Sequence, residues 1–326
     1  MMKVSVIVPI YRVECFIERC ARSLFQQTMR EVEFIFVNDA TPDKSMHILH
    51  QVIKDYPDRI PSVKLLTHKE NKGLPATRND GLSIASGEYI YHCDSDDYIE
   101  PDMLEVLYNT AKRENADIVW CDWFLSFHER QRYMRQPYYT KPLEAVKAML
   151  SGGMKFNVWN KLVKHNLYVD NCIDFPSGNG MGEDMTMIML FAKASKIAYV
   201  PRAFYHYVKT NTNAISQTYS AKHLQELHFN VARIADFLHN EYGTDLEREI
   251  AFMKLEVKFP FLLSEDSHKI ALWGQWYPEA NSYILSNKYI SIRSRLLQWF
   301  AWKRMFWVVR LYKTLLNKIV YGLLYR

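Results

Sequence analysis

The stretch Asp94-Ser95-Asp96-Asp97, which follows the apolar run Glu88-Tyr89-Ile90-Tyr91-His92-Cys93, decides the fold class and predicts a site. The apolar run follows the turn signal Ser86-Gly87 and is typical of a short buried strand. Three carboxylates within four positions repel one another and lose hydration, unless a cation or hydrogen-bond donors compensate. Oxygen ligands at the end of a strand are typical of sites where Mg²⁺ or Mn²⁺ also holds substrate phosphates. The alternative is a solvated acidic turn that caps the helix expected from about Pro101.

Strand-like and helical segments alternate on both sides of this stretch through the first 125 residues. The alternation predicts an α/β fold, a mostly parallel sheet with helices on both faces, in which ligands bind beyond the carboxyl ends of the strands. The expected strands are Val4–Ile10, Val32–Val37, Val63–Thr67, Glu88–Cys93 and Ala116–Trp123. The expected helices are Val13–Gln26, Ser45–Tyr56, Leu74–Ala85 and Pro101–Glu114. The polar clusters expected to converge on one crevice are Pro9-Ile10-Tyr11, Asn38-Asp39, Asn71-Lys72-Gly73 with Arg78, and the acidic stretch.

Beyond about residue 140 the pattern is less regular and more helical. A helix is expected over Leu143–Leu150, and the Gly-rich loop 177–182 precedes Glu183-Asp184 and a Met-rich helix to about Ala194. The glycine spacing differs from that of a dinucleotide-binding fingerprint, so the loop is interpreted as a mobile substrate loop. We expect three parts, namely a catalytic domain over 1–215, a helical region over 216–290 and a basic tail over 291–326.

The tail is distinguished by its charge. The formal net charge of the chain is +5, yet residues 292–326 contain eight Lys or Arg and no Asp or Glu, which leaves −3 for the rest. The apolar residues that fall on one helical face are Met305, Val308, Tyr312, Leu315, Ile319 and Leu323. The other side carries Lys303, Arg304, Arg310 and Lys318, with Trp299, Trp302 and Trp307 among them. This pattern predicts a helix lying at an anionic membrane surface. The alternative is a helix that packs on the protein itself or on a dimer partner. Binding of the tail to nucleic acid would fit its positive charge but no other feature of the sequence.

Composition and cysteine usage predict an intracellular globular protein. Hydrophobic residues make up 48% of the chain, and no apolar run reaches the roughly 18 residues of a membrane span. The five cysteines are scattered without a Cys-x-x-Cys pair, which is typical of a reducing compartment. The apolar start is broken too early for a signal peptide. We therefore expect a cytoplasmic protein that lies peripherally on the inner face of the cell membrane.

Six blocks of sequence, in their order along roughly residues 3–215, resemble the family 2 glycosyltransferases of the bacterial polysaccharide type, which have the GT-A fold. The blocks are Ser5–Tyr11, Phe36–Asp43, Asn71–Gly81, Asp94–Asp97, Trp159-Asn160-Lys161 and Gly182-Glu183-Asp184. The resemblance implies an enzyme that binds a nucleotide-sugar, usually UDP-linked, and inverts the anomeric centre in one displacement. Two positions depart from the family pattern, Asn38 in place of a second Asp and Thr41-Pro42 in place of Ser-Thr.

The resemblance also implies roles for individual residues in binding the donor. Asp39 would hold the nucleobase, with Pro9 and Tyr11 lining its pocket. Asp96 would ligate Mn²⁺ or Mg²⁺. Asp94 would assist at the metal or the ribose, and Ser95 would complete the donor site.

The chemistry of sugar transfer suggests two further sets of residues. A departing diphosphate must be neutralised, and Arg78 could add a guanidinium to the metal there; alternatively, Arg78 is a solvated residue of an amphipathic helix. An attacking hydroxyl needs a base, for which we favour Asp184 supported by Glu183. Alternatively, both acids cap the following helix.

Two aromatic residues have open interpretations. His206 could be a third metal ligand and Trp159 could be a platform for a sugar ring, but both residue types are also typical of a protein core.

We therefore expect an inverting, metal-dependent hexosyltransferase of the EC 2.4 class. It would move a sugar from a UDP-sugar to a glycan or lipid-linked oligosaccharide acceptor in surface polysaccharide synthesis. A sugar nucleotidyltransferase would need a Gly- and Lys-rich phosphate loop after the first strand, where this chain has Tyr11-Arg12-Val13-Glu14. A non-catalytic nucleotide- or glycan-binding protein is disfavoured by the intact acidic cluster.

Overall fold

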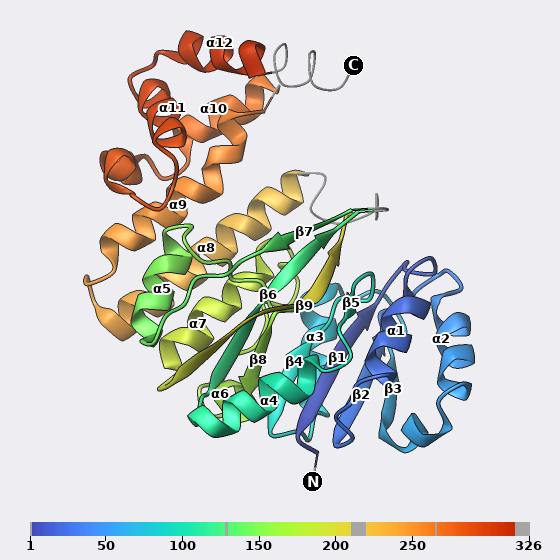
Figure 1. Ribbon diagram of the computed structural model, residues 1–326. Coiled ribbons are helices and arrows are strands. Elements are labelled where there is room, and N and C mark those ends of the chain that lie inside the picture. The colour runs from blue at the N-terminus through green and yellow to red at the C-terminus, as the bar shows by residue number, and fades with distance from the viewer. Residues whose placement is uncertain (1, 128–129, 210–219, 265, 317–326) are drawn as a thin grey trace. The chain divides into compact units, whose positions relative to one another are not determined.

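The structure is a computed structural model that describes residues 2–127, 130–209, 220–264 and 266–316 (Figure 1). Its contacts divide the chain into two compact units. The sheet unit contains Met1–Glu144 and Phe156–Phe237, and the helical unit contains Ala145–Lys155 and Leu238–Arg326. The functional boundaries expected near residues 215 and 290 remain a prediction.

The sheet unit is built on one mixed sheet that, among the described residues, has nine strands in the order β3-β2-β1-β4-β8-β6-β9-β5, with β7 pairing to β6. Most of its paired residues lie in parallel pairings, of β1 with β2 and β4, of β2 with β3, and of β6 with β9. The strands are β1 (Val4–Ile10), β2 (Val32–Asn38), β3 (Val63–Thr67), β4 (Tyr89–His92), β5 (Tyr98–Ile99), β6 (Ile118–Ser126), β7 (Gln131–Met134), β8 (Lys161–Lys164) and β9 (Ile197–Val208). The α/β fold class is confirmed.

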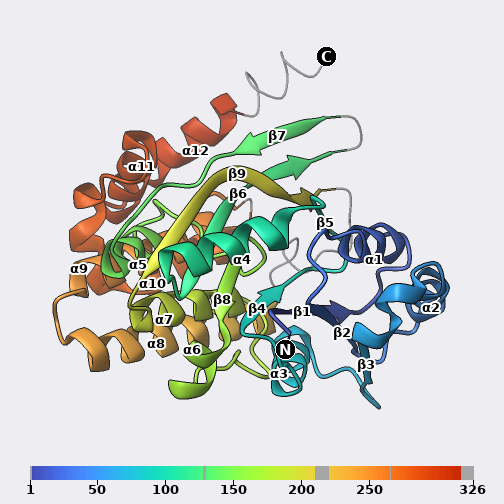
Figure 2. The ribbon, with the colours of Figure 1, turned by 60° about the horizontal axis from the view of Figure 1, so that its bottom comes forward.

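Helices cover both faces of this sheet, as the apolar strands require. Every residue of β1 and β2 is buried, which is why both strands are continuous apolar runs rather than alternating ones. Figure 2 shows α1 and α4 on one face and α3 on the other. The helices of this part are α1 (Ile17–Phe25), α2 (Ser45–Lys54), α3 (Leu74–Ser83), α4 (Met103–Glu114), α6 (His165–Asp170) and α7 (Thr186–Lys193), with short 3-10 helices η1 (Pro57–Ser62) and η2 (Glu183–Met185).

The first expected helix starts later than the sequence predicts. Helix α1 begins at Ile17 rather than at Val13. The backbone N–H of Val13 donates to Ser45 Oγ at 3.1 Å, and that of Glu14 donates to Asp43 Oδ2 at 3.0 Å. These side chains, which lie about thirty residues further along the chain, hold residues 13 and 14 in a loop beside the end of β1.

The helical unit has its own apolar core. The core cluster contains Ala251, Leu255, Ala280 and Ile284, and Trp299 packs against it. The remaining elements are α5 (Pro142–Leu150) and α8 (Ala221–Tyr242), which span the division between the units, then α9 (Glu247–Leu262), α10 (Ser267–Gln275), the 3-10 helix η4 (Pro278–Ser286), α11 (Ile292–Trp302) and α12 (Phe306–Leu316). The helical C-terminal extension is therefore confirmed.

The tail does not form the single amphipathic helix that the sequence suggests. It forms α11 and α12, and the chain turns between them, where Arg304 has a positive φ of 60°. Within α12, Val309 is buried, and Val308 and Tyr312 are half-buried. Of the expected membrane-facing stripe, Met305, Val308 and Tyr312 are therefore half-buried and Leu315 is exposed, while Ile319, Leu323 and Lys318 lie outside the described residues. Among the described residues, no helix combines the length and apolarity needed to cross a bilayer.

Candidate active site

The predicted strand-end clusters meet because the strands that carry them are neighbours in the sheet. The backbone N–H of Asp39 donates to Ile10 O at 3.0 Å, which joins the end of β2 to the end of β1. The N–H of His68 donates to Asn38 O at 2.9 Å, which joins the end of β3 to that of β2. Cys93, at the end of β4, donates its N–H to Ile7 O at 3.0 Å. The polar residues that follow β1 to β4 therefore share one edge of the sheet.

Asp39 is a buried anchor at this edge. Its Oδ1 accepts hydrogen bonds from the N–H of Lys72 and from His68 Nδ1, both at 2.7 Å, and its Oδ2 accepts from the N–H of Gly73 at 2.9 Å. Gly73 has a φ of 86°, which a residue without Cβ adopts readily. Asp39 thus fixes the loop that leads into α3, and its role at the nucleobase remains a prediction.

The other residues predicted to hold the nucleobase lie beside this anchor. Pro9 is buried within β1, and Tyr11, just beyond the strand, is 40% exposed. Asn38, at the position where the family commonly has Asp, accepts a hydrogen bond from the N–H of Thr41 at 2.9 Å. Thr41 Oγ1 in turn accepts from the N–H of Arg12 at 2.8 Å. The departures from the family pattern therefore serve the turn after β2.

The acidic stretch after β4 separates into residues with different surroundings. Asp97 is completely buried, and it accepts hydrogen bonds from Tyr205 Oη at 2.5 Å and from the N–H of Val208 at 2.7 Å. Burial, together with the neighbouring charges of Asp96 and Asp94, raises the pKa of Asp97 well above its usual range. Asp94 and Asp96 remain partly exposed, and Ser95 between them is buried. The turn is therefore neither fully solvated nor a simple cap.

Arg78 joins this stretch to the second acidic pair. Its side chain, from α3, is only 1% exposed. Nη2 donates to Asp94 Oδ1 at 2.8 Å, and Nε donates to Glu183 Oε1 at 3.3 Å. Burial alone would lower the pKa of Arg78, but the carboxylates of Glu183, Asp94 and Asp184 outweigh it and hold that pKa above its usual range. The interpretation of Arg78 as a solvated surface residue is wrong. Its predicted contact with a diphosphate stays a prediction.

Glu183 and Asp184 form η2, immediately after Gly182 with its φ of 86°. Glu183 is buried and Asp184 is partly exposed. Burial raises the pKa of both carboxyl groups, and for Glu183 the rise is large. Gly182 and Met185, which occupy the N-cap positions of η2 and α7, provide no side-chain cap, and Glu183 is held by Arg78 instead. Both acids nevertheless lie in the first turn of η2, and the role of Asp184 as a base remains a prediction.

Lys161 is a site residue that the sequence interpretation did not single out. It is 1% exposed, and its Nζ donates to Asn157 O at 2.6 Å and to Asn160 Oδ1 at 2.9 Å. Burial lowers the pKa of Lys161 to about 7, while the charge of Asp184 acts in the opposite direction. The signal available in the sequence was a lysine inside the matching block Trp159-Asn160-Lys161, directly before the apolar residues of β8.

Two residues with open alternatives are placed in the core. Trp159 is buried and stacks on Tyr205, with ring centroids 4.3 Å apart. The His206 ring stacks on Tyr98 at 4.1 Å, and its Nε2 lies 2.7 Å from Glu100 Oε1. These contacts support the structural interpretation of both residues.

The partly exposed carboxylates fit a divalent ion that is completed by substrate. Among the described residues, no group of three or more His, Cys, Asp or Glu side chains gathers as a complete metal cage. However, Mg²⁺ typically takes one or two carboxylates and fills its other positions with phosphate oxygens and water. Asp94 and Asp96 would supply this number of ligands, and their charges, after burial, add to the raised pKa of Asp97 beside them.

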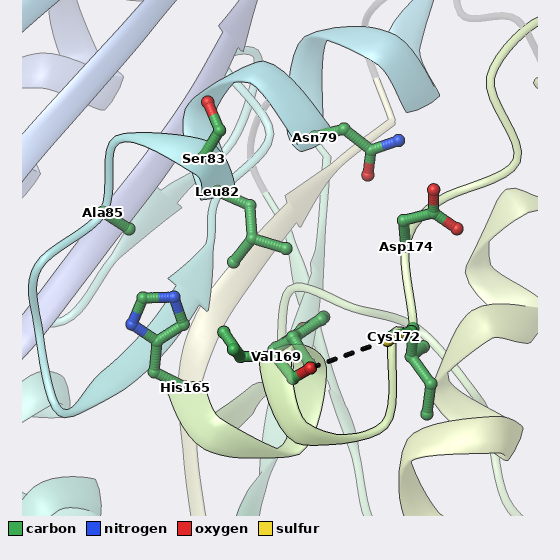
Figure 3. A pocket seen from close by; sticks show the side chains of 10 residues that line it. Asn79, Leu82, Ser83, Ala85, His165, Val169, Cys172 and Asp174 are labelled. Carbon is green, nitrogen blue, oxygen red and sulfur yellow. Dashed lines mark hydrogen bonds between the residues drawn. The ribbon is translucent and has the colours of Figure 1, made fainter.

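A separate cavity of about 500 Å³ lies between α3 and α6 (Figure 3). None of the predicted site carboxylates lines it. One of its polar residues, Asn79, already exchanges hydrogen bonds of 2.8 Å with the backbone N–H and C=O of Phe175. The residues that line it are Asn79, Leu82, Ser83, Ala85, His165, Tyr168, Val169, Cys172, Ile173 and Asp174.

Comparison with known proteins identifies the family. Residues 5–180 match the sequence model described as "Glycosyl transferase family 2". The chain is similar to "Putative glycosyltransferase EpsH" of Bacillus subtilis, with 34% identity over 67% of this chain and 64% of that protein. It is also similar to "Cholesterol galactosyltransferase" of Borreliella burgdorferi, with 31% identity over 83% of this chain and 77% of that protein.

A solved structure supports the fold. The crystal structure of S. aureus TarS 1-349 in complex with UDP-GlcNAc has a TM-score of 0.69 and covers 98% of this chain and 92% of that chain, at 21% identity. At this identity the likeness concerns the fold, and it agrees with the expected GT-A class. Because the family match spans more than half of the chain and contains the first five of the six blocks quoted above, the chain belongs to glycosyl transferase family 2.

Proposed function

We propose that this chain is an inverting, metal-dependent glycosyltransferase that moves a sugar from a UDP-sugar to a glycan acceptor. The observation that carries the proposal is the buried Arg78, which binds both Asp94 and Glu183. A donor-side carboxylate and the acidic pair that would serve the acceptor are 89 residues apart in sequence, and one guanidinium holds them together. Sugar transfer needs both kinds of group at one centre.

On the donor side, Asp94 and Asp96 would hold Mn²⁺ or Mg²⁺. When bound, the ion supplies a Lewis acid that neutralises the departing diphosphate. Pro9, Tyr11 and Asp39 would surround the nucleobase, and the buried Ser95 would fix the acidic turn. The solved relative in fold was crystallised with UDP-GlcNAc, which supports a UDP-linked donor for this chain.

On the acceptor side, Asp184 would take the proton from the attacking hydroxyl. Its partial exposure lets an acceptor reach it, and burial raises its pKa above the usual range of an aspartate, which makes it a stronger base. Glu183 would support it as a positioning residue, because the Glu183 carboxylate is buried against Arg78. A base opposite the leaving diphosphate permits a single displacement, and therefore inversion.

The acceptor is proposed to be lipid-linked and to be met at the inner face of the cell membrane during surface polysaccharide synthesis. The name of one relative specifies transfer to cholesterol, a membrane lipid, which supports an acceptor held in a membrane. The basic composition of residues 292–326 supports the same location.

The proposal is tested by incubating the full chain with a panel of UDP-sugars and measuring UDP release with Mn²⁺ or with EDTA. We expect release from at least one donor in Mn²⁺ and none in EDTA. The matched variant Asp96→Ala should stay inactive after Mn²⁺ is returned, because it lacks a ligand. Binding of UDP-sugars without any release or transfer would instead support the non-catalytic alternative, and transfer only from donors with another nucleotide would contradict the UDP assignment.

A further inference from the structure

Helix α12 presents an apolar stripe that no described residue covers. Trp307, Leu311 and Leu315 are 63%, 52% and 47% exposed. Their spacing of four residues places them along one side of the helix. This stripe is distinct from the inward side of α12, where Val309 is 3% exposed. We call Trp307, Leu311 and Leu315 the outer stripe.

Internal contacts explain why the inward side is the one that packs. Val309 is buried, Tyr312 is half-buried, and Arg293 of α11 lies over the Tyr312 ring at 5.7 Å. Lys313 Nζ donates to Ser264 O at 2.5 Å, which ties α12 to the segment that follows α9. The helix is therefore fixed in rotation within the helical unit, and the outer stripe stays outward.

The residues around the outer stripe are basic. Arg310 lies beside it on α12 and is exposed, as are Lys303 and Arg304 in the turn before the helix. Lys303 Nζ lies over the Trp302 ring at 4.3 Å, and this Trp is 40% exposed. Residues 292–326 contain no Asp or Glu at all, so nothing in this segment offsets the positive charge.

From this combination we infer that the outer stripe of α12 docks the chain on an anionic lipid bilayer, with Trp307, Leu311 and Leu315 entering the interface and Arg310, Lys303 and Arg304 meeting the headgroups. Amphipathic tryptophan and flanking basic residues are typical of helices that lie in the membrane interface. The inference rests on the proposed function in so far as the membrane brings the acceptor. Of the apolar face that the sequence alone suggested, the outer stripe keeps only Leu315.

Flotation of the full chain with lipid vesicles tests the inference. One vesicle set contains phosphatidylcholine and phosphatidylglycerol in equal parts, and the other contains phosphatidylcholine alone. We expect flotation with the anionic set, little with the neutral set, and a decrease with salt as the Debye length falls to about 10 Å at 0.1 M. Leu311→Ser should weaken binding about tenfold, and Arg310→Glu should weaken it at least about fivefold.

Matched controls lie in the same unit but outside α12. Leu285→Ser changes a leucine of η4 that is 51% exposed, and Lys288→Glu reverses an exposed charge. Both should float as the wild type does. A Val308→Ser change on the half-buried side of α12 should lower the melting temperature more than it lowers flotation.

Three outcomes would overturn the inference. They are equal flotation of wild type, Leu311→Ser and Arg310→Glu; no flotation of the wild type with either vesicle set; and a concentration-dependent dimer, seen by light scattering, that Leu311→Ser abolishes. UDP release from a UDP-sugar in free solution is measured on the same proteins. Because this activity needs no membrane, failure of docking and failure of the proposed chemistry give different results.

Discussion

At the scale of single residues, the sequence predicts which groups gather but not how each one is used. The acidic stretch is visible as a cluster, yet nothing local shows that Asp97 alone turns inward to Tyr205 and Val208. Those partners lie more than a hundred residues away and are brought in by β9. The sequence of α3 likewise gives no sign that Arg78 is buried, because Asp94 and Glu183 come beside it only in the folded chain. Burial, which sets these pKa values, is a property of the tertiary structure.

The charge of Lys161 should tune the proposed base. This charge lowers the pKa of Asp184 against the rise caused by burial. A base must be deprotonated, so activity falls as the pH drops through the pKa of Asp184. Lys161→Met removes the positive charge, and we expect the acid limb of the kcat/KM profile to move to higher pH, chiefly below pH 7, where Lys161 keeps its proton.

The control for this experiment is Lys164→Met, on the same strand but with a side chain 37% exposed and paired to Asp117. Its pH profile should match that of the wild type. An unshifted acid limb in folded Lys161→Met, verified by circular dichroism, would show that Lys161 does not act on the base.

At the scale of elements, short runs rich in apolar residues were enough to predict the parallel strands β1 to β4. Strands Val4–Ile10 and Val63–Thr67 have the predicted bounds, β2 is one residue longer at its end, and β4 is one residue shorter at each end. Element starts that depend on distant side chains were not predictable. The start of α1 is set by hydrogen bonds from the backbone of residues 13 and 14 to the side chains of Ser45 and Asp43. The break between α11 and α12 contains no glycine or proline that would have predicted it from the sequence.

Arg78 should be the main link between α3, the end of β4 and η2. Arg78→Met leaves Glu183 buried without its cation, and breaking a buried pair typically costs about 3–5 kcal/mol of unfolding free energy. The folded-state pKa of Glu183 already lies above its usual value and should rise further. A carboxyl group with a raised folded-state pKa loses stability as pH rises, so the deficit should grow from acidic to neutral pH.

Urea unfolding of wild type, Arg78→Met and the double variant Arg78→Met/Glu183→Gln measures this link. The double variant should recover much of the loss and show a weaker dependence on pH, because no buried charge remains at position 183. Independent, additive effects of the two substitutions would contradict the pairing.

At the scale of the whole molecule, the sequence predicts an α/β domain followed by helices, and the structure confirms both. It does not predict that Ala145–Lys155, within the first half of the chain, belongs to the helical unit. The reason is visible in the contacts, since Asn287 Nδ2 donates to Ser151 O at 3.1 Å and Glu256 approaches Gly152. Such pairings across more than a hundred residues leave no periodicity in the sequence.

The central claim is that one centre holds a metal-bound UDP-sugar through Asp94 and Asp96 and activates the acceptor through Asp184. The most direct test measures UDP-sugar affinity and turnover on the same full-length proteins in Mn²⁺. Asp96→Ala should lose both donor affinity and turnover. Asp184→Asn should bind the donor as the wild type does but turn over about 10²–10⁴-fold more slowly, the usual contribution of a positioned general base. Loss of donor binding in Asp184→Asn, or turnover of that variant at the wild-type rate, would contradict the claim.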